Sequence, residues 1–148
     1  MNNEDKELLL KDLCARLPYH VRCKIWLKEG TTEEGPLDLQ HNYGNVLLDA
    51  FYYNKIKDIK PYLRTISSMT KKEVDELFHI LSINEKNSKE WLKVNDIGII
   101  RLFTEEGKDF YEIAEAMDYL HSIHIDYRGL ISKGLAIAVT KENNPYKE

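Results

Sequence analysis

Asp49, Asp58 and Lys60 come closest to a catalytic set in this sequence. Asp58 and Lys60 are two residues apart in a predicted strand, so their side chains share one face of a sheet. Magnesium-dependent nucleases hold the metal with two carboxylates on neighbouring strands, and a lysine two residues after the second polarises the attacking water. The tripeptide Asp-x-Lys is common, however, and no further acidic ligand has a clear place. An exposed strip of salt bridges is therefore the alternative interpretation.

The same strand face continues through Tyr62 and Arg64, which makes it basic and aromatic. Lys60, Tyr62 and Arg64 are expected on one side of the strand, and Pro61 indicates an edge strand because it cannot donate to a ladder. Such a strip can contact phosphates and stack a base, or it can meet an acidic protein surface. Pairing of Arg64 with Asp126 inside the protein is the structural alternative.

Gly129 and Gly134 have the spacing of the two glycines in a phosphate-binding loop. Such a loop needs a strand before the first glycine and Lys-Ser/Thr after the second, because the lysine reaches the outer phosphates and the hydroxyl binds magnesium. Here Gly134 is followed by Leu135 and Ala136, and the preceding segment is helical. We therefore expect a turn at Gly129, a short helical turn over "LISK" and a cap at Gly134, with no nucleotide cofactor.

The stretch "EIAEAMDYLHSIH" carries five potential metal ligands at intervals of three, namely Glu112, Glu115, Asp118, His121 and His124. Each step of three turns a helix by about −60°, so the set winds around the helix. His124 is expected on the apolar stripe, which leaves at most His121 and Asp118 to share an ion, and zinc needs three or four protein ligands. The sequence therefore predicts a solvated acidic face beside a histidine at the edge of the core, and no metal site.

Cys14 and Cys23 are expected to be two reduced, buried thiols, because one lies in a helix pattern and the other on the inward face of a strand pattern. A thiol nucleophile is not expected. His20 and Cys23 differ by an odd number of residues, so they face opposite sides of a strand.

Helix and strand signals predict the elements that position these residues. A helix is expected over 4–17, ended by Pro18, a second begins after Thr70 with an explicit capping box to Glu73, and a third spans about 109–123. Strands are expected at 21–28, 46–53, 59–64, 97–103 and 135–139, with a short alternating piece at 37–41 and a loop at 29–36. The fold class that follows is α+β: one domain over 1–148, an antiparallel sheet of about four to six strands covered on one side by three main helices, and a flexible polar tail over about 141–148.

The chain has 148 residues, of which 43% are hydrophobic and 31% are charged, as is typical of one globular domain. Its net charge of −4 is uneven, since residues 1–74 carry 12 Lys/Arg and 11 Asp/Glu, and residues 75–148 carry 9 and 14. Overall charge therefore does not attract nucleic acid, which would need a local patch. No apolar run reaches the roughly twenty residues that span a bilayer, and the N-terminal stretch lacks the pattern of a secretory signal. We expect a cytoplasmic protein with no membrane contact.

Three phrases, "DLCARLPY" (12–19), "KPYLRTISSMT" (60–70) and "DYRGLISKGLAI" (126–137), resemble a family of uncharacterised small proteins from gut anaerobic bacteria and their phages. The phrases are spread from end to end of the chain. The family's middle phrase has proline where this chain has Thr65, a departure expected to loosen the start of the following helix. The resemblance implies a bacterial or phage origin and a single-domain fold, and it implies no activity, cofactor or catalytic residue.

These features together predict a non-enzymatic accessory or interaction protein that binds a protein partner or a second copy of itself. The expected binding residues are Lys60, Tyr62 and Arg64, with Tyr127 and Arg128 as possible additions. A nucleic-acid-binding protein and a magnesium-dependent nuclease are the alternatives.

Overall fold

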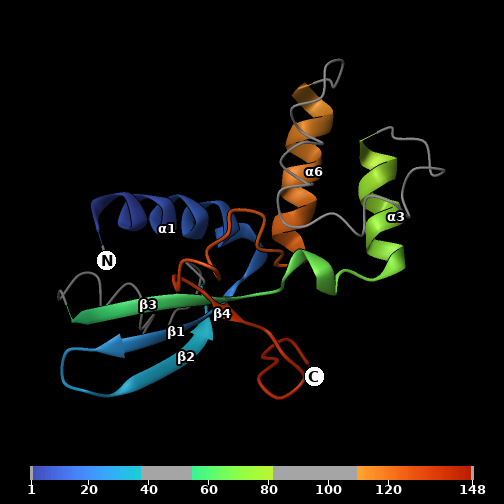
Figure 1. Cartoon of the computed structure of the whole chain (residues 1–148). Coiled ribbons are helices and arrows are strands. Elements are labelled where there is room, and N and C mark those ends of the chain that lie inside the picture. Colours follow the sequence, from blue (N-terminus) through green and yellow to red (C-terminus); the bar gives the residue numbers. More distant parts are fainter. Residues whose placement is uncertain (1, 38–54, 82–109, 148) are drawn as a thin grey trace. The chain divides into compact units, whose positions relative to one another are not determined.

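A computed structural model describes residues 2–37, 55–81 and 110–147 of the chain (Figure 1). These residues belong to two compact units. The sheet unit comprises Met1–Leu63 and Leu130–Glu148, and the helical unit comprises Arg64–Gly129. Within these ranges, three α-helices and a four-stranded sheet make the protein α+β, which confirms the predicted fold class and a strand number within the predicted range.

The first helix of the sheet unit is α1 (Asn3–Arg16). The Asn2 side chain caps it by accepting a hydrogen bond from the Asp5 amide at 2.7 Å, and Pro18 ends it by forcing the short 3-10 turn η1 (Leu17–Tyr19). The helix is therefore confirmed close to its predicted bounds. Cys14, expected to be buried, is exposed on this helix together with Leu10, whereas Asp12 and Arg16 are buried beside Leu9 and Leu13.

The sheet has the strand order β2-β1-β3-β4, built from β1 (Arg22–Leu27), β2 (Thr32–Pro36), β3 (Ile56–Leu63) and β4 (Ile137–Ala138). β1 pairs antiparallel with both β2 and β3, whereas β4 pairs parallel with β3. The sheet is thus mixed, where the sequence predicted only antiparallel pairing. The strand candidates at 46–53 and 97–103, and the piece at 37–41 beyond Leu37, lie outside the described residues.

β2 occupies a stretch for which the sequence predicted a loop. Its residues are mostly exposed, so it lacks the apolar alternation that marks a half-buried strand. A tight turn at Gly30, with φ of 95°, brings the chain back, and the Leu27 amide donates to the Thr31 carbonyl at 2.9 Å to begin the pairing. Pairing with β1, rather than burial of its own side chains, makes this segment a strand.

The sequence predicted an edge strand at Pro61. This prediction is wrong, because β3 lies between β1 and β4. The carbonyl of Leu63 accepts from the Val139 amide on the β4 side, so the nitrogen of Pro61, two residues earlier, faces that side as well. Pairing with β4 begins only at Tyr62. The missing donor of the proline therefore falls just outside this ladder.

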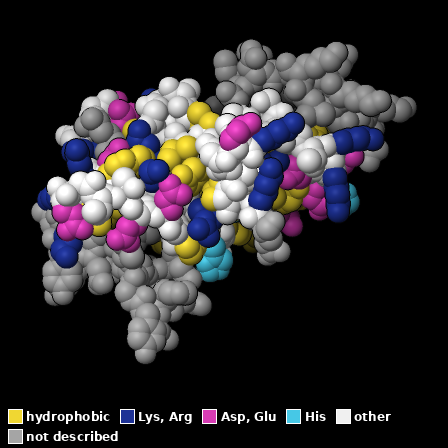
Figure 2. Space-filling view, turned by 90° about the horizontal axis from the view of Figure 1, so that it is seen from below, with side chains coloured by type: hydrophobic (Ala, Val, Ile, Leu, Met, Phe, Trp, Pro, Cys, Tyr) yellow, Lys and Arg dark blue, Asp and Glu magenta, His cyan; other side chains and the backbone are white. Residues whose placement is uncertain are grey.

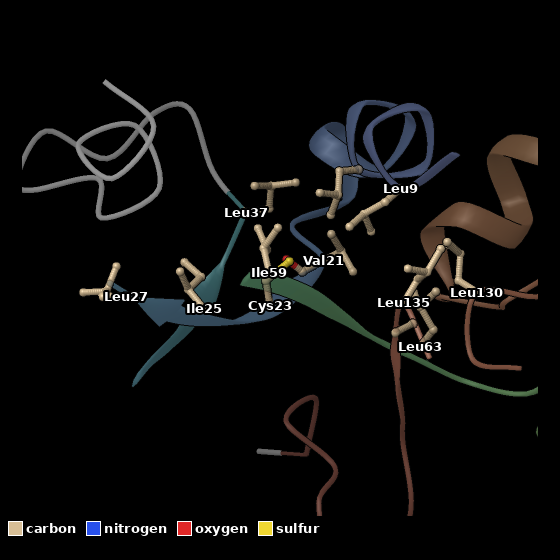
Figure 3. Packing of buried hydrophobic residues seen from close by; sticks show 12 residues of the cluster. Leu9, Val21, Cys23, Ile25, Leu27, Leu37, Ile59, Leu63, Leu130 and Leu135 are labelled. Atoms are coloured by element: carbon tan, nitrogen blue, oxygen red, sulfur yellow. The ribbon is translucent and has the colours of Figure 1, made fainter. Parts of the chain in front are cut away.

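The core of the sheet unit forms where α1 packs on one face of the sheet (Figure 3). Inward side chains of β1 and β3 meet the apolar residues of α1 and of the segment before β4. Its buried members are Leu9, Leu13, Val21, Cys23, Ile25, Leu27, Leu37, Ile59, Leu63, Leu130, Leu135 and Ala136. The alternating burial along β1 confirms the strand pattern that the sequence predicted there.

The helical unit contains η2 (Ile66–Ser68), α3 (Lys71–Ile80) and α6 (Phe110–Ser122). Both hydrogen bonds of the predicted capping box at Thr70 and Glu73 are present, and Met69 and Val74 at the staple positions are buried. The buried residues of its core are Met69, Val74, Leu77, Phe78, Leu81, Ala116, Leu120, Ile125 and Tyr127. Among the described residues, no helix is long and apolar enough to cross a membrane.

Candidate functional site: the outer face of the sheet

Three strands contribute alternate side chains to the sheet surface that points away from the core. Their registers place Lys24 of β1 opposite both Glu34 of β2 and Lys60 of β3, and they place Trp26 opposite Asp58. Residues in register share a face, because side chains alternate along a strand. We call this surface the outer face; its members are Arg22, Lys24, Trp26, Thr32, Glu34, Pro36, Asp58, Lys60 and Tyr62.

Trp26 lies between two lysines on the outer face. The Lys24 and Lys60 ammonium groups are 5.8 Å and 5.9 Å from the centroid of its ring. Each lysine also has a carboxylate neighbour, Lys24 with Glu34 at 2.9 Å and Lys60 with Asp58 at 4.0 Å. Figure 2, seen from below, shows hydrophobic side chains between cationic and anionic ones on the side where the strands lie. The result is an aromatic surface whose charges are largely paired.

Tyr62 is on the outer face, as predicted, but it is only 6% exposed. Its hydroxyl donates to the Glu34 carboxylate at 2.9 Å. Burial and this carboxylate raise the pKa of Tyr62, whereas hydrogen bonds from Lys24 and then Tyr62 lower the pKa of Glu34. Tyr62 therefore stabilises the outer face as a buried residue. Trp26 supplies the partly exposed ring of the outer face, and sequence reasoning did not select it.

Arg64, the third residue of the predicted strip, is used inside the helical unit. Its guanidinium donates to the two carboxylate oxygens of Glu73 at 2.6 and 3.0 Å and to the Ser68 carbonyl at 3.0 Å. The hydrogen bonds from Arg64 lower the pKa of Glu73 to about 2. Internal pairing of Arg64 is thus found, but with Glu73 rather than with Asp126. Asp126 contacts Arg64 through the main chain, its amide donating to the Arg64 carbonyl at 2.8 Å.

Tyr127 and Arg128, the additional binding candidates, form an internal network with His121. The Arg128 Nε donates to the Tyr127 hydroxyl at 2.9 Å, and the guanidinium lies 5.2 Å from the ring centroid. The hydroxyl lies 2.8 Å from His121 Nε2. The Tyr127 hydroxyl therefore forms hydrogen bonds with both Arg128 and His121. Tyr127 is buried and belongs to the core of the helical unit.

The histidines and carboxylates of α6 do not converge in the described part of the chain, where no three potential ligands gather. His121 is buried, and His124 lies beyond the end of α6 with φ of 59°, so it is not on the helical stripe where the sequence placed it. Asp58 accepts a hydrogen bond from the Ile59 amide at 2.9 Å. Asp49, the other carboxylate of the predicted nuclease set, lies outside the described residues.

A buried ion pair that sequence reasoning missed lies on α1, on the side of the sheet away from the outer face. Asp12 and Arg16 are completely buried, with Arg16 Nε 2.7 Å from an Asp12 carboxylate oxygen. Their spacing of four along α1, on the same face as Leu9 and Leu13, was the available signal. Burial, and next the Asp12 charge, raise the pKa of the Cys23 thiol to about 12, which makes this buried cysteine inert.

Comparison of the chain with models of protein families, with curated proteins and with solved structures finds no match. The functional argument therefore rests on the geometry of the outer face.

Proposed function

We propose that the chain is a non-enzymatic accessory or interaction protein, of bacterial or phage origin, that binds a protein partner through the outer face of its sheet. The observation that carries the proposal is the half-exposed Trp26 ring between the Lys24 and Lys60 ammonium groups. Aromatic side chains are enriched where proteins bind each other, and a large ring gives much contact area at little entropic cost.

The balance of charge on the outer face favours a protein over a nucleic acid. Lys24 and Lys60 each lie close to a carboxylate, from Glu34 and Asp58 respectively. A phosphate backbone approaching Trp26 would meet these two anions beside the two cations. A protein surface can offer both signs of charge, and it can exchange partners with each pair.

The stacking of cations on Trp26 also supports a second candidate, binding of single-stranded nucleic acid. An aromatic ring on an open sheet face, with lysines beside it, is the arrangement on which bases stack. This candidate requires affinity that falls steeply with salt, because bound phosphates release counterions.

Affinity capture tests the proposed function with two matched baits. The first carries Trp26→Ala and Lys60→Ala, and the control carries Lys57→Ala, an exposed lysine of the same strand that is not a member of the outer face. Lysate of the source organism is applied with and without nuclease, and the retained proteins are identified by mass spectrometry. We expect one protein to be retained by the wild type and by the control, with or without nuclease, and to be lost from the double variant. Equal retention by all three baits would contradict the proposal, and loss after nuclease would favour nucleic acid.

A further inference from the structure

A tyrosine from the C-terminal segment is inserted between two strands of the sheet. The Arg22 amide of β1 donates to the Tyr146 hydroxyl at 3.2 Å, and that hydroxyl donates to the Tyr62 carbonyl of β3 at 2.7 Å. The register of the two strands ends next to this point, at Cys23 opposite Pro61. The hydroxyl thus takes the place of the next direct bond between the main chains.

A compact turn folds the C-terminal segment back so that Tyr146 can reach the sheet. The Thr140 amide donates to the Asn143 side chain at 2.6 Å, and the Asn143 side chain donates to the Ala138 carbonyl of β4 at 2.9 Å. In Figures 1 and 3 the segment after β4 lies on the side of the sheet away from α1, which is the side of the outer face. The residues for which a flexible tail was expected therefore contribute a contact to the sheet.

The closed arrangement leaves one polar group unsatisfied. Arg22 Nε is buried and has no hydrogen-bond partner in the part of the chain that the structure describes. If the segment moved away, water could accept a hydrogen bond from this nitrogen. The open form would then have a hydrogen bond that the closed form lacks. Within the segment, residues 140–143 and 147 are exposed, so the burial that opposes such movement is confined to residues 144–146, which are half-buried.

We infer that residues 140–147 form a latch that closes on the Arg22–Tyr62 end of the outer face and opens without unfolding of the sheet. In the closed state the Tyr146 hydroxyl holds the Arg22 amide and the Tyr62 carbonyl. In the open state both main-chain groups and the Arg22 guanidinium face water at the end of the outer face. The latch is a property of the sheet unit and does not depend on the proposed function.

Amide hydrogen exchange, followed residue by residue by NMR on the full chain, tests the latch. Tyr146→Phe removes the bridging hydroxyl and keeps the ring, and Tyr111→Phe, at a tyrosine that is 81% exposed, is the matched control. We expect the Arg22 amide to exchange about tenfold faster in the Tyr146 variant, the loss corresponding to one hydrogen bond, while the amides of Ile25 and Ile59 keep their rates. The control should exchange as the wild type does.

Two results would overturn the latch. An unchanged exchange rate at Arg22 in Tyr146→Phe would show that the hydroxyl does not protect that amide. A parallel increase at Arg22, Ile25 and Ile59 would show that the segment opens only when the whole sheet unfolds.

Discussion

The guanidinium of Arg64 and the carboxylate of Glu73 form a two-bonded ion pair, with N–O distances of 2.6 and 3.0 Å, that links the residue after β3 to the first turn of α3. The same carboxylate accepts a hydrogen bond from the Thr70 amide at 2.6 Å and so completes the helix cap. One glutamate therefore serves both the helix start and the connection that leads to it.

This pair predicts how stability depends on pH. The folded-state pKa of Glu73, about 2, lies below its ordinary value of 4.5, so the pair stabilises the fold above pH 4.5. That contribution is lost as the pH falls from 4.5 towards 2. The difference between these two pKa values corresponds to at most about 3 kcal/mol of stability. Denaturation by urea between pH 2 and 7 should show a shallower pH dependence for Glu73→Gln than for wild type. Glu7→Gln, at an exposed i,i+4 pair, should leave the profile unchanged.

The buried pair of Asp12 and Arg16 predicts a large effect of breaking one partner alone. Asp12→Ala should lower the free energy of unfolding by about 3 to 5 kcal/mol, because it leaves the Arg16 charge buried without this carboxylate. Replacing both residues by apolar ones, as in Asp12→Leu with Arg16→Met, should recover most of the loss. Urea denaturation of the two variants measures the difference. A double variant as unstable as the single one would contradict a role of charge in the loss.

The two cysteines are expected to react at very different rates. Cys14 is exposed on α1, whereas Cys23 is buried and its pKa is raised to about 12 by burial and by Asp12. A maleimide should label Cys14 in the native protein at least about a hundredfold faster than Cys23, since the thiolate is the reactive form. Mass spectrometry of digested protein distinguishes the two sites. Comparable labelling of both before denaturation would show that Cys23 is accessible.

The outer face predicts that its exposed members can be changed without loss of the fold. Trp26→Ala and Lys60→Ala remove half-exposed side chains that are absent from the apolar core, so the melting temperature should fall by only a few degrees, which corresponds to about 1 kcal/mol. Tyr62→Ala should cost more, because Tyr62 is buried and hydrogen-bonded to Glu34. Circular dichroism during heating measures all three variants. A Trp26 variant that fails to fold would show that the ring is needed for folding.

The helices could be predicted from sequence because their ends carry local chemical signals. Thr70 and Glu73 form a capping box from residues three apart, and Pro18 cannot continue α1 because it lacks an amide hydrogen and clashes with the preceding turn. The alternation of β1 is likewise local. These elements needed no knowledge of their neighbours.

The elements that sequence reasoning missed depend on pairing between distant segments. β2 is a strand because β1 lies beside it, and Pro61 is tolerated inside the sheet because pairing with β4 begins one residue later. The sequence offered Asp126 as an alternative, internal partner of Arg64. In the fold the guanidinium pairs with Glu73, and the Asp126 amide donates to the Arg64 carbonyl. Trp26 was missed as a site residue because its lysine neighbours come from two different strands.

The most direct measurement of the proposed interface is crosslinking from the position of Trp26. A photoreactive phenylalanine derivative replaces Trp26 in one chain and Lys57, an exposed residue of β3 outside the outer face, in the other, and both are irradiated in lysate of the source organism. Binding through the outer face predicts one crosslinked protein from position 26 and none from position 57. Equal crosslinking from both positions, or a crosslink from position 26 to nucleic acid alone, would contradict it.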